Sequence, residues 1–391
     1  MAFFCVALAA CGSSSREVQT VTGGSGSESG AGGEGAADGS AEGQAGVSEQ
    51  NASDTSASGF KTFENRCKTE ISSFVAVNDG TFELMTADSV LWKLEPAKDQ
   101  ATIIRKFENP PSDYRLMPIS NFILFVKDAA MLQFSDSGKS VFKLQGMAHT
   151  PLFASADGQQ IAILETSTLI HFWNVKEKFE GIAGSDRVQD YINRQLPSYN
   201  LTMPNDIVAL DIGSERRTVV AINDTESNRK GVLYFYNPNV SNVDLKNLGR
   251  TNNDLKVLKM SPSTAFVAVI DEVNALKMAK SDVQGFLPWT QAYTDTRWIV
   301  WNGASLIFQN GNKILSVSPE DGKIGWEAET SESYTSCVHN GDILLCSANQ
   351  MLDVVSAKDG TLRKRVAMSG EKFGIITPDG IKGSLESDCV K

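Results

Sequence analysis

The chain has 391 residues, 41% hydrophobic and 21% charged, which excludes a polytopic membrane protein and a wholly disordered chain. Its 36 Lys and Arg stand against 47 Asp and Glu, and this net charge of -11 opposes binding to the phosphates of nucleic acid, so we expect no nucleic-acid partner. Only three histidines are present, which leaves few residues for histidine-based metal or acid–base sites.

The first eleven residues are apolar and end at Cys11. The run is too short to cross the roughly 30 Å of a hydrocarbon core, so it indicates a secretion signal rather than a transmembrane helix. Leu8-Ala9-Ala10-Cys11-Gly12 resembles the lipobox of bacterial lipoproteins, although no Lys or Arg precedes it. The resemblance implies that Cys11 carries lipid and, with Gly at position 12, that the protein is sorted to the outer membrane; we expect it to face the periplasm.

Residues 12–59 form a predicted linker. They hold 12 Gly, seven acidic residues and a single basic one, with almost no large apolar side chain. Such a segment cannot bury enough surface to offset the entropy of ordering, so we expect a disordered tether. About 48 residues of Gly-rich chain span roughly 40 Å on average, which would hold the remaining domain, residues 60–391, clear of a membrane.

From residue 60 onward short β-rich runs alternate with Gly, Asp, Asn, Ser and Pro turns, which is typical of an all-β fold. Each unit has an apolar strand, a very apolar second strand and a charged edge strand. The second strands begin near Ser89, Ala129, Thr168, Gly231, Val273, Asn312 and Gln350. Their spacing stays near 40 residues with one longer step of 63. Four-stranded antiparallel blades of this length predict a seven-bladed β-propeller, with eight blades as the alternative.

The turn sequences support a resemblance to known repeat families. The stretches 155–162, 169–175 and, more loosely, 261–268 resemble WD40 blades, and 318–326 is similar to the PQQ-like repeat of quinoproteins, with a weaker copy at 356–364. In that turn Asp321 and Gly322 favour a tight turn with positive φ, and Trp326 is expected to cover the seam between blades. A lipobox joined to such repeats is also similar to the propeller lipoprotein of the outer-membrane β-barrel assembly machine.

The longer step places an insertion of about 24 residues near 182–205. Within it Val188, Tyr191 and Ile192 fall at helical spacing after a capping Ser185. One interpretation is a helix that lies on a blade edge. The other is a partner-binding or channel-covering element, because long insertions in compact folds are often functional.

Four cysteines remain in the expected mature chain once Cys11 is assigned to lipid: Cys67, Cys337, Cys346 and Cys389. Three pairings of these cysteines into two disulfides are then available, and we favour one of them. Cys67 with Cys389 would lock the two chain ends, whose strands 60–65 and 373–377 we expect to close the ring within one blade. Cys337 with Cys346 would join neighbouring strands. Free thiols are the alternative, and the spacing lacks a zinc-ligand signature.

The quinoprotein resemblance raises the hypothesis of a quinone-dependent oxidoreductase with its cofactor in a central channel. Asp211, Asp271 and Glu272 could line such a channel, although charges at strand ends are more often solvated turn residues. The chain has no adjacent Cys pair, nucleophile elbow, Walker loop or HExxH sequence. We therefore expect no enzyme activity, no metal and no cofactor.

Aromatic residues cluster at Trp289, Tyr293, Trp298 and Trp301. They either pack between blades or, where exposed, anchor a partner, since Trp and Tyr dominate binding hot spots. We therefore predict a non-catalytic protein-interaction scaffold, a monomer within a complex of envelope or outer-membrane proteins, held at the membrane by lipid alone. A small-ligand sensor is the other class of function that the sequence leaves open.

Overall fold

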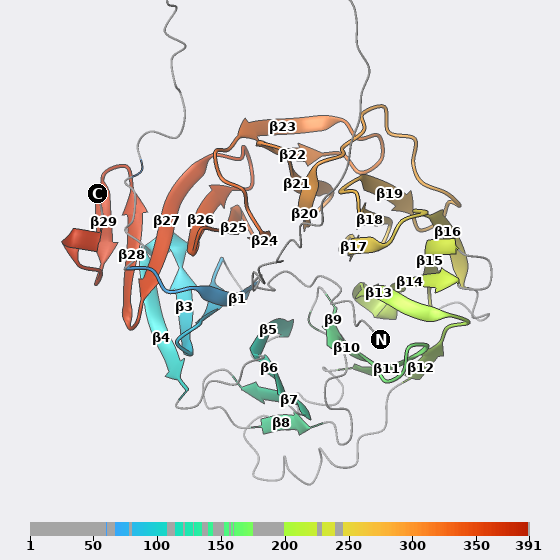
Figure 1. The fold of residues 1–391 in the computed structure, drawn as a ribbon, viewed down its shortest axis with the longest axis horizontal. Coiled ribbons are helices and arrows are strands. Elements are labelled where there is room, and N and C mark those ends of the chain that lie inside the picture. The colour runs from blue at the N-terminus through green and yellow to red at the C-terminus, as the bar shows by residue number, and fades with distance from the viewer. Residues whose placement is uncertain are drawn as a thin grey trace, which may run out of the picture. The chain divides into compact units, whose positions relative to one another are not determined.

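The apolar runs of the sequence form short antiparallel β-strands, shown in Figure 1 for a computed structural model. The structure describes residues 60, 67–77, 80–107, 114–119, 122–127, 129–134, 140–143, 152–155, 158, 160–174, 199–224, 229–238 and 245–389. The predicted signal and linker, including Cys11, lie outside these residues. The all-β prediction is confirmed, and three short 3-10 turns complete the described elements: η2 (Pro96–Lys98), η3 (Ser214–Arg216) and η4 (Ser387–Cys389).

The strands of the first half make four sheets of four strands each. The first sheet comprises β1 (Ile71–Ala76), β2 (Phe82–Thr86), β3 (Val90–Glu95) and β4 (Gln100–Lys106). The second comprises β5 (Tyr114–Ile119), β6 (Phe122–Lys127), β7 (Ala129–Phe134) and β8 (Ser140–Lys143). The third comprises β9 (Leu152–Ala154), β10 (Gln160–Leu164), β11 (Leu169–Asn174) and β12 (Tyr199–Thr202). The fourth comprises β13 (Asp206–Ile212), β14 (Thr218–Asp224), β15 (Arg229–Tyr236) and β16 (Lys246–Arg250).

The second half makes three sheets of unequal size, with three, four and six strands. The fifth comprises β17 (Leu255–Met260), β18 (Phe266–Asp271) and β19 (Leu276–Lys280). The sixth comprises β20 (Thr296–Asn302), β21 (Ser305–Asn310), β22 (Lys313–Val317) and β23 (Ile324–Glu329). The seventh comprises β24 (Ser336–Asn340), β25 (Ile343–Ala348), β26 (Met351–Ser356), β27 (Leu362–Ser369), β28 (Lys372–Thr377) and β29 (Gly380–Gly383).

The repeat is confirmed, but its phase differs from the prediction. The seven segments read as second strands are β3, β7, β11, β15, β19, β22 and β26, which are the third strands of their sheets. Third strands gave a clear signal because most of their described residues are buried. Every residue of β26 is buried, whereas partly buried and exposed residues alternate along the edge strand β23.

The predicted insertion is shorter than expected at its C-terminal end. Residues 199–202, placed within it, form β12, which pairs with β11 as the fourth strand of the third sheet. Tyr199 lies opposite Phe172 and Leu201 opposite Ile170 in that pairing. The preceding residues 175–198, with Val188, Tyr191 and Ile192, lie outside the described residues.

The hydrophobic core lies between neighbouring sheets rather than in one central mass. The first strand of each sheet packs beside the first strand of the next, and β24 packs beside β1 (Figure 1). One apolar cluster joins the first and last sheets through Trp92, Leu352 and Ile375, and similar clusters fill the later seams. Complete burial of one such side chain stabilises the fold by about 1.5–3 kcal/mol.

The fifth sheet lacks a regular fourth strand in the described chain. The connection that follows β19 makes only isolated bridges to it, from Phe286 to Ala279 and from Tyr293 to Leu276. Between these bridges stands Pro288, which has no N–H to donate to a sheet. An irregular segment therefore covers the outer edge of the fifth sheet.

The two chain ends meet at the seam between the first and last sheets. The N–H of Thr69 donates to the carbonyl of Met368 at 2.7 Å, which brings the chain before β1 onto β27. Asn340 Nδ2 donates to the carbonyls of Val77 and Thr81 at 2.7 and 2.9 Å. Strand β28, which we expected to pair with residues 60–65, pairs with β27 and β29 instead. Residues 61–66 lie outside the described residues.

Candidate functional site

Both predicted disulfides are present. Cys67 and Cys389 are joined with their Cα atoms 5.5 Å apart and 322 residues between them in sequence, so the bond links the two ends of the described chain. Cys337 on β24 lies directly opposite Cys346 on β25, and that bond spans a sequence separation of 9. All four cysteines are buried.

Two of the predicted partner-binding aromatics are buried and do not reach the surface. Tyr293 is 2% exposed, packs edge-on against Phe308 with ring centroids 4.8 Å apart, and donates its hydroxyl to the carbonyl of Gly322. Trp298 is 4% exposed and donates its Nε1 to Gln309 Oε1 at 3.3 Å. Because both side chains fill the core, the prediction that they anchor a partner is corrected.

Trp289 packs at the seam between the fifth and sixth sheets. Its Nε1 donates to the carbonyl of Pro319 at 3.1 Å, and its ring lies against Gly322 in the turn between β22 and β23. Trp326 repeats this contact one sheet further on, where its ring lies against Gly360 after β26. The predicted seam role of Trp326 is confirmed, and Trp289 has the same role.

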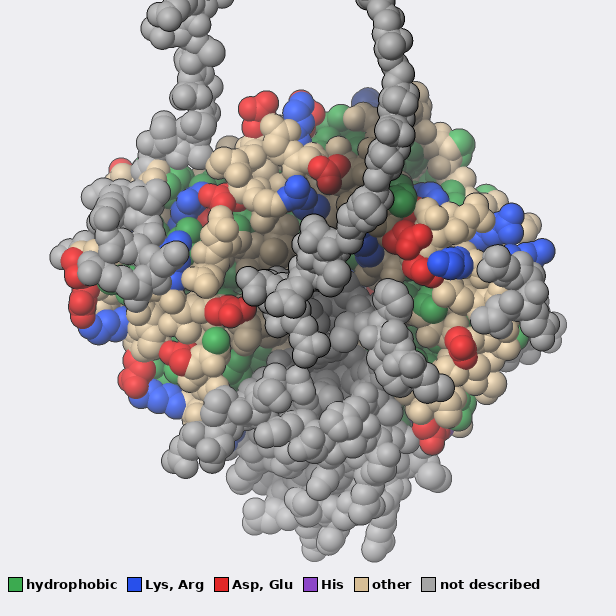
Figure 2. Space-filling view, in the orientation of Figure 1, with side chains coloured by type: hydrophobic (Ala, Val, Ile, Leu, Met, Phe, Trp, Pro, Cys, Tyr) green, Lys and Arg blue, Asp and Glu red, His purple; other side chains and the backbone are tan. Residues whose placement is uncertain are grey.

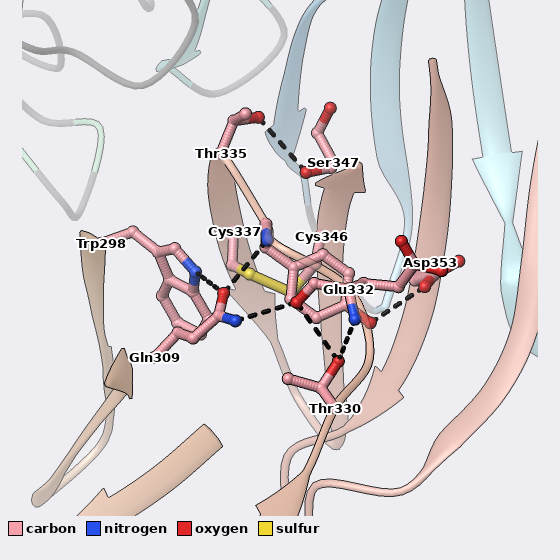
Figure 3. The surroundings of a disulfide bond; sticks show 10 residues. Trp298, Gln309, Thr330, Glu332, Thr335, Cys337, Cys346, Ser347 and Asp353 are labelled. Atoms are coloured by element: carbon pink, nitrogen blue, oxygen red, sulfur yellow. Dashed lines mark hydrogen bonds between the residues drawn. A yellow bond between two sulfur atoms is a disulfide. The ribbon is translucent and has the colours of Figure 1, made fainter. Parts of the chain in front are cut away.

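A buried polar network lies beside the Cys337–Cys346 bond (Figure 3). Tyr334 donates its hydroxyl to Asp353 Oδ2 at 2.9 Å, and Arg365 Nε stands 3.4 Å from the other oxygen of that carboxylate. Arg365 also donates to Glu332 at 2.8 Å. Burial raises the pKa of Asp353 to about 6, against the opposing effects of Arg365 and the Tyr334 hydroxyl.

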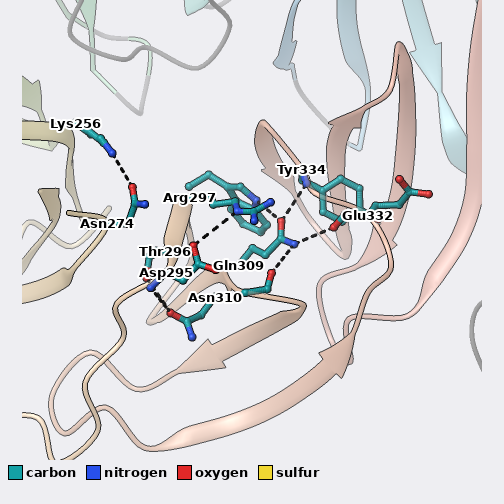
Figure 4. Close-up of polar contacts among 11 residues, drawn as sticks. Lys256, Asn274, Asp295, Thr296, Arg297, Gln309, Asn310, Glu332 and Tyr334 are labelled. Carbon is teal, nitrogen blue, oxygen red and sulfur yellow. Dashed lines mark hydrogen bonds and ion pairs between the residues drawn. The ribbon is translucent and has the colours of Figure 1, made fainter. Parts of the chain in front are cut away.

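Gln309 connects this network to the sixth sheet (Figure 4). Its Oε1 accepts from Trp298 and from the N–H of Tyr334, and its Nε2 donates to the carbonyls of Gly311 and Glu332. All the bonding groups of this amide are therefore occupied. The network ties the sixth sheet to the seventh and has a structural role.

The carboxylates considered for a central channel are also engaged. Asp211 on β13 accepts from the N–H of Met260 on β17 at 2.7 Å, and burial raises its pKa despite Lys259 nearby. Asp271 is 1% exposed and accepts from the N–H groups of Val273 and Ala275, which shapes the turn after β18. Asp211 therefore joins β13 to β17, and Asp271 holds the turn that follows β18.

A small pocket opens where the turns of the fifth and sixth sheets meet. It has a volume of about 290 Å³, and its walls are mainly apolar. Phe266 and Trp301 form the aromatic walls, and the turns at 261–263 and 303–304 complete it. Its rim is held in place, since Arg217 donates to Thr264 at 2.5 Å and Ser214 to the carbonyl of Pro262. The sequence showed Phe266 and Trp301 only as parts of repeat and aromatic patterns, without placing them together.

Acidic and basic side chains lie among one another over most of the surface seen in Figure 2. In the described part of the chain, no group of three or more His, Cys, Asp and Glu side chains is placed to hold a metal ion. Nor is any helix in those residues long and apolar enough to span a bilayer.

Comparisons with known proteins show the fold. No family model matches the sequence, and no curated protein does. A computationally designed protein, Ika8, aligns with a TM-score of 0.53 and 10% identity over 84% of this chain and 99% of its own. Hsv2 of Kluyveromyces lactis, a β-propeller protein, aligns with a TM-score of 0.51 and 11% identity over 76% and 98%. The chain therefore has a β-propeller fold.

Proposed function

We propose that this chain is a lipid-anchored, periplasm-facing β-propeller of seven blades that acts as a non-catalytic scaffold for protein–protein interactions in the bacterial outer membrane. The lipobox resemblance at Cys11 supports the anchor. The similarity of the repeats and lipobox to the propeller lipoprotein of the β-barrel assembly machine favours outer-membrane protein assembly as the process served.

The observation that carries the scaffold role is the pocket formed by Phe266 and Trp301. Aromatic side chains in a concave, apolar site supply binding energy to protein interfaces. This pocket opens between the fifth and sixth sheets, on turns that are fixed by hydrogen bonds. A rigid site loses little entropy when it binds, which suits a scaffold.

Photo-cross-linking from the pocket rim tests this role. Ala304 is exposed at the rim, and Val283 is an exposed apolar residue elsewhere, 43% accessible. A photoreactive amino acid at 304 is expected to trap discrete envelope proteins, whereas one at 283 traps none of them. Ala304→Arg, which fills the pocket, abolishes capture of the same proteins by the tagged chain, and Val283→Arg preserves it. Capture that is unaffected by Ala304→Arg contradicts the proposal.

The anchor has a separate test. Wild-type protein is expected to incorporate labelled fatty acid and to fractionate with the outer membrane, and Cys11→Ser is expected to lose both properties. A Cys11→Ser protein that remains in the outer-membrane fraction contradicts lipid anchoring without bearing on the pocket.

A further inference from the structure

A second pocket lies at the outer edge of the fourth sheet, against the irregular segment that covers the fifth. Its volume is about 220 Å³. The N–H of Gly285 donates to the carbonyl of Leu248 on β16 at 2.9 Å, and Gly249 faces Gly285 with no side chain between them. Because two glycines allow the chains to approach closely, residue 284 is brought to the same wall as β15 and β16.

Two arginines line this pocket without any partner. Arg229 begins β15 and Arg250 ends β16, and both side chains are exposed. Among the arginine side chains that the structure describes, these two alone make no hydrogen bond, ion pair or ring contact, whereas others such as Arg217 and Arg365 are engaged. Figure 2 shows basic side chains gathered over this side of the molecule.

The other wall groups include two amides with unused hydrogen-bonding capacity. Asn247 accepts from the N–H of Gly249 at 2.8 Å, which leaves its Nδ2 group without a partner, and Gln284 has no hydrogen bond. The ring of Tyr234 forms an apolar wall, and the carboxylate of Asp224 also lines the pocket. Two arginines and one aspartate give the site one net positive charge.

We propose that this pocket binds the carboxylate of an acidic residue in an extended segment of a partner protein. Arginine matches a carboxylate in shape and charge, and side-chain amides pair with both the N–H and the carbonyl of a peptide. The single net positive charge fits one carboxylate. A phosphate with nearly two negative charges would lie against Asp224, so the charges favour the peptide. The proposal rests on the scaffold function above and specifies the chemistry of one partner.

The test uses the purified full-length chain and a fluorescein-labelled deca-glutamate peptide at low ionic strength, followed by anisotropy. Arg229→Gln and Arg250→Gln are each expected to weaken binding about three- to fivefold, and the double variant about tenfold, because exposed charge pairs have modest strength. Lys246→Gln is the matched control: it removes the same charge from β16 but does not line the pocket. It is expected to bind as wild type, and a deca-glutamine peptide is expected not to bind.

Either of two results overturns the proposal. One is deca-glutamate binding by the double variant equal to that of wild type. The other is arginine-dependent binding of inorganic phosphate, or of phosphatidylglycerol vesicles, that is tighter than binding of the peptide. If the peptide-binding test fails while the photoreactive amino acid at 304 still captures partners, only the proposed carboxylate site is contradicted. Arginine-dependent peptide binding without any partner captured at 304 would contradict the scaffold function instead.

Discussion

The ring of Trp326 occupies the space that a side chain at Gly360 would need: its Cζ3 atom lies 2.6 Å from the position of a Cβ there. The two residues belong to adjacent sheets, so the absence of a side chain at one is required for packing of the other. Gly360 also has φ of +74°, which glycine adopts at little cost. Turn geometry and inter-sheet packing therefore depend on the same residue.

Gly360→Ala is expected to lower the free energy of unfolding by about 2–4 kcal/mol, because backbone strain and overpacking add. Gly341→Ala separates the two causes, since Gly341 has φ of +62° with nothing within 4 Å of its Cβ position. That control is expected to cost about 1 kcal/mol. Urea titration measures both, and equal losses would show that Trp326 contributes nothing.

The two disulfides are expected to stabilise the fold unequally. Loop-closure entropy gives roughly 6 kcal/mol for a loop of 322 residues and roughly 3 kcal/mol for one of 9. Replacing Cys67 and Cys389 by serine is therefore expected to lower the thermal midpoint more than replacing Cys337 and Cys346. The reverse order in calorimetry would show that local packing, rather than chain closure, determines their contributions.

Because the pKa of Asp353 is raised in the folded state, we expect its contribution to the free energy of unfolding to fall as pH rises. Its folded pKa of about 6 lies above the roughly 3.9 of an unfolded Asp, so the folded state holds the proton more tightly. Its contribution is complete below pH 4, declines between pH 4 and 6 and is lost above that. The difference amounts to about 3 kcal/mol.

Asp353→Asn keeps an oxygen for the Tyr334 hydroxyl and removes the ionisation. Relative to this variant, the wild type is expected to lose about 2 kcal/mol between pH 4 and pH 7, as measured by urea unfolding. Parallel pH profiles for the two proteins would contradict a raised pKa at Asp353.

Asn340→Ala tests the hydrogen bonds that join the last sheet to the first, in addition to the Cys67–Cys389 disulfide. The change removes two hydrogen bonds from one amide to the turn between β1 and β2, and we expect a loss of about 1–2 kcal/mol. Asn302→Ala, which removes one longer bond of 3.5 Å to Ala357, is expected to cost less. The opposite ranking would show that the closure does not depend on Asn340.

Most of the features that the sequence predicted correctly are determined by local pattern. The repeat spacing came from third strands buried on both faces, the cysteine pairs from their positions along those repeats, and the role of Trp326 from its turn. The repeat spacing and the turn before Trp326 depend on residues within one unit, where periodicity and turn chemistry carry direct information. The Cys67–Cys389 pair depends instead on the positions of the two cysteines at the ends of the domain.

The features that the sequence could not show depend on contacts between units. Tyr293 and Trp298 are as apolar as interface residues, and only the packing of Phe308 and Gln309 against them reveals that they are buried. Likewise, Arg229 and Arg250 share a pocket because β15 and β16 pair. Nothing near either arginine in sequence marks it as unpaired.

The Cys67–Cys389 bond also determines how the domain responds to mechanical load. Tension applied through the chain before Cys67 enters the fold at a covalent crosslink to its far end rather than at the hydrogen bonds of β1. The strands between the two cysteines form a closed covalent loop that cannot be peeled away from either terminus. Tension between the chain before Cys67 and the chain after Cys389 is therefore carried by this covalent bond and bypasses the strands between them.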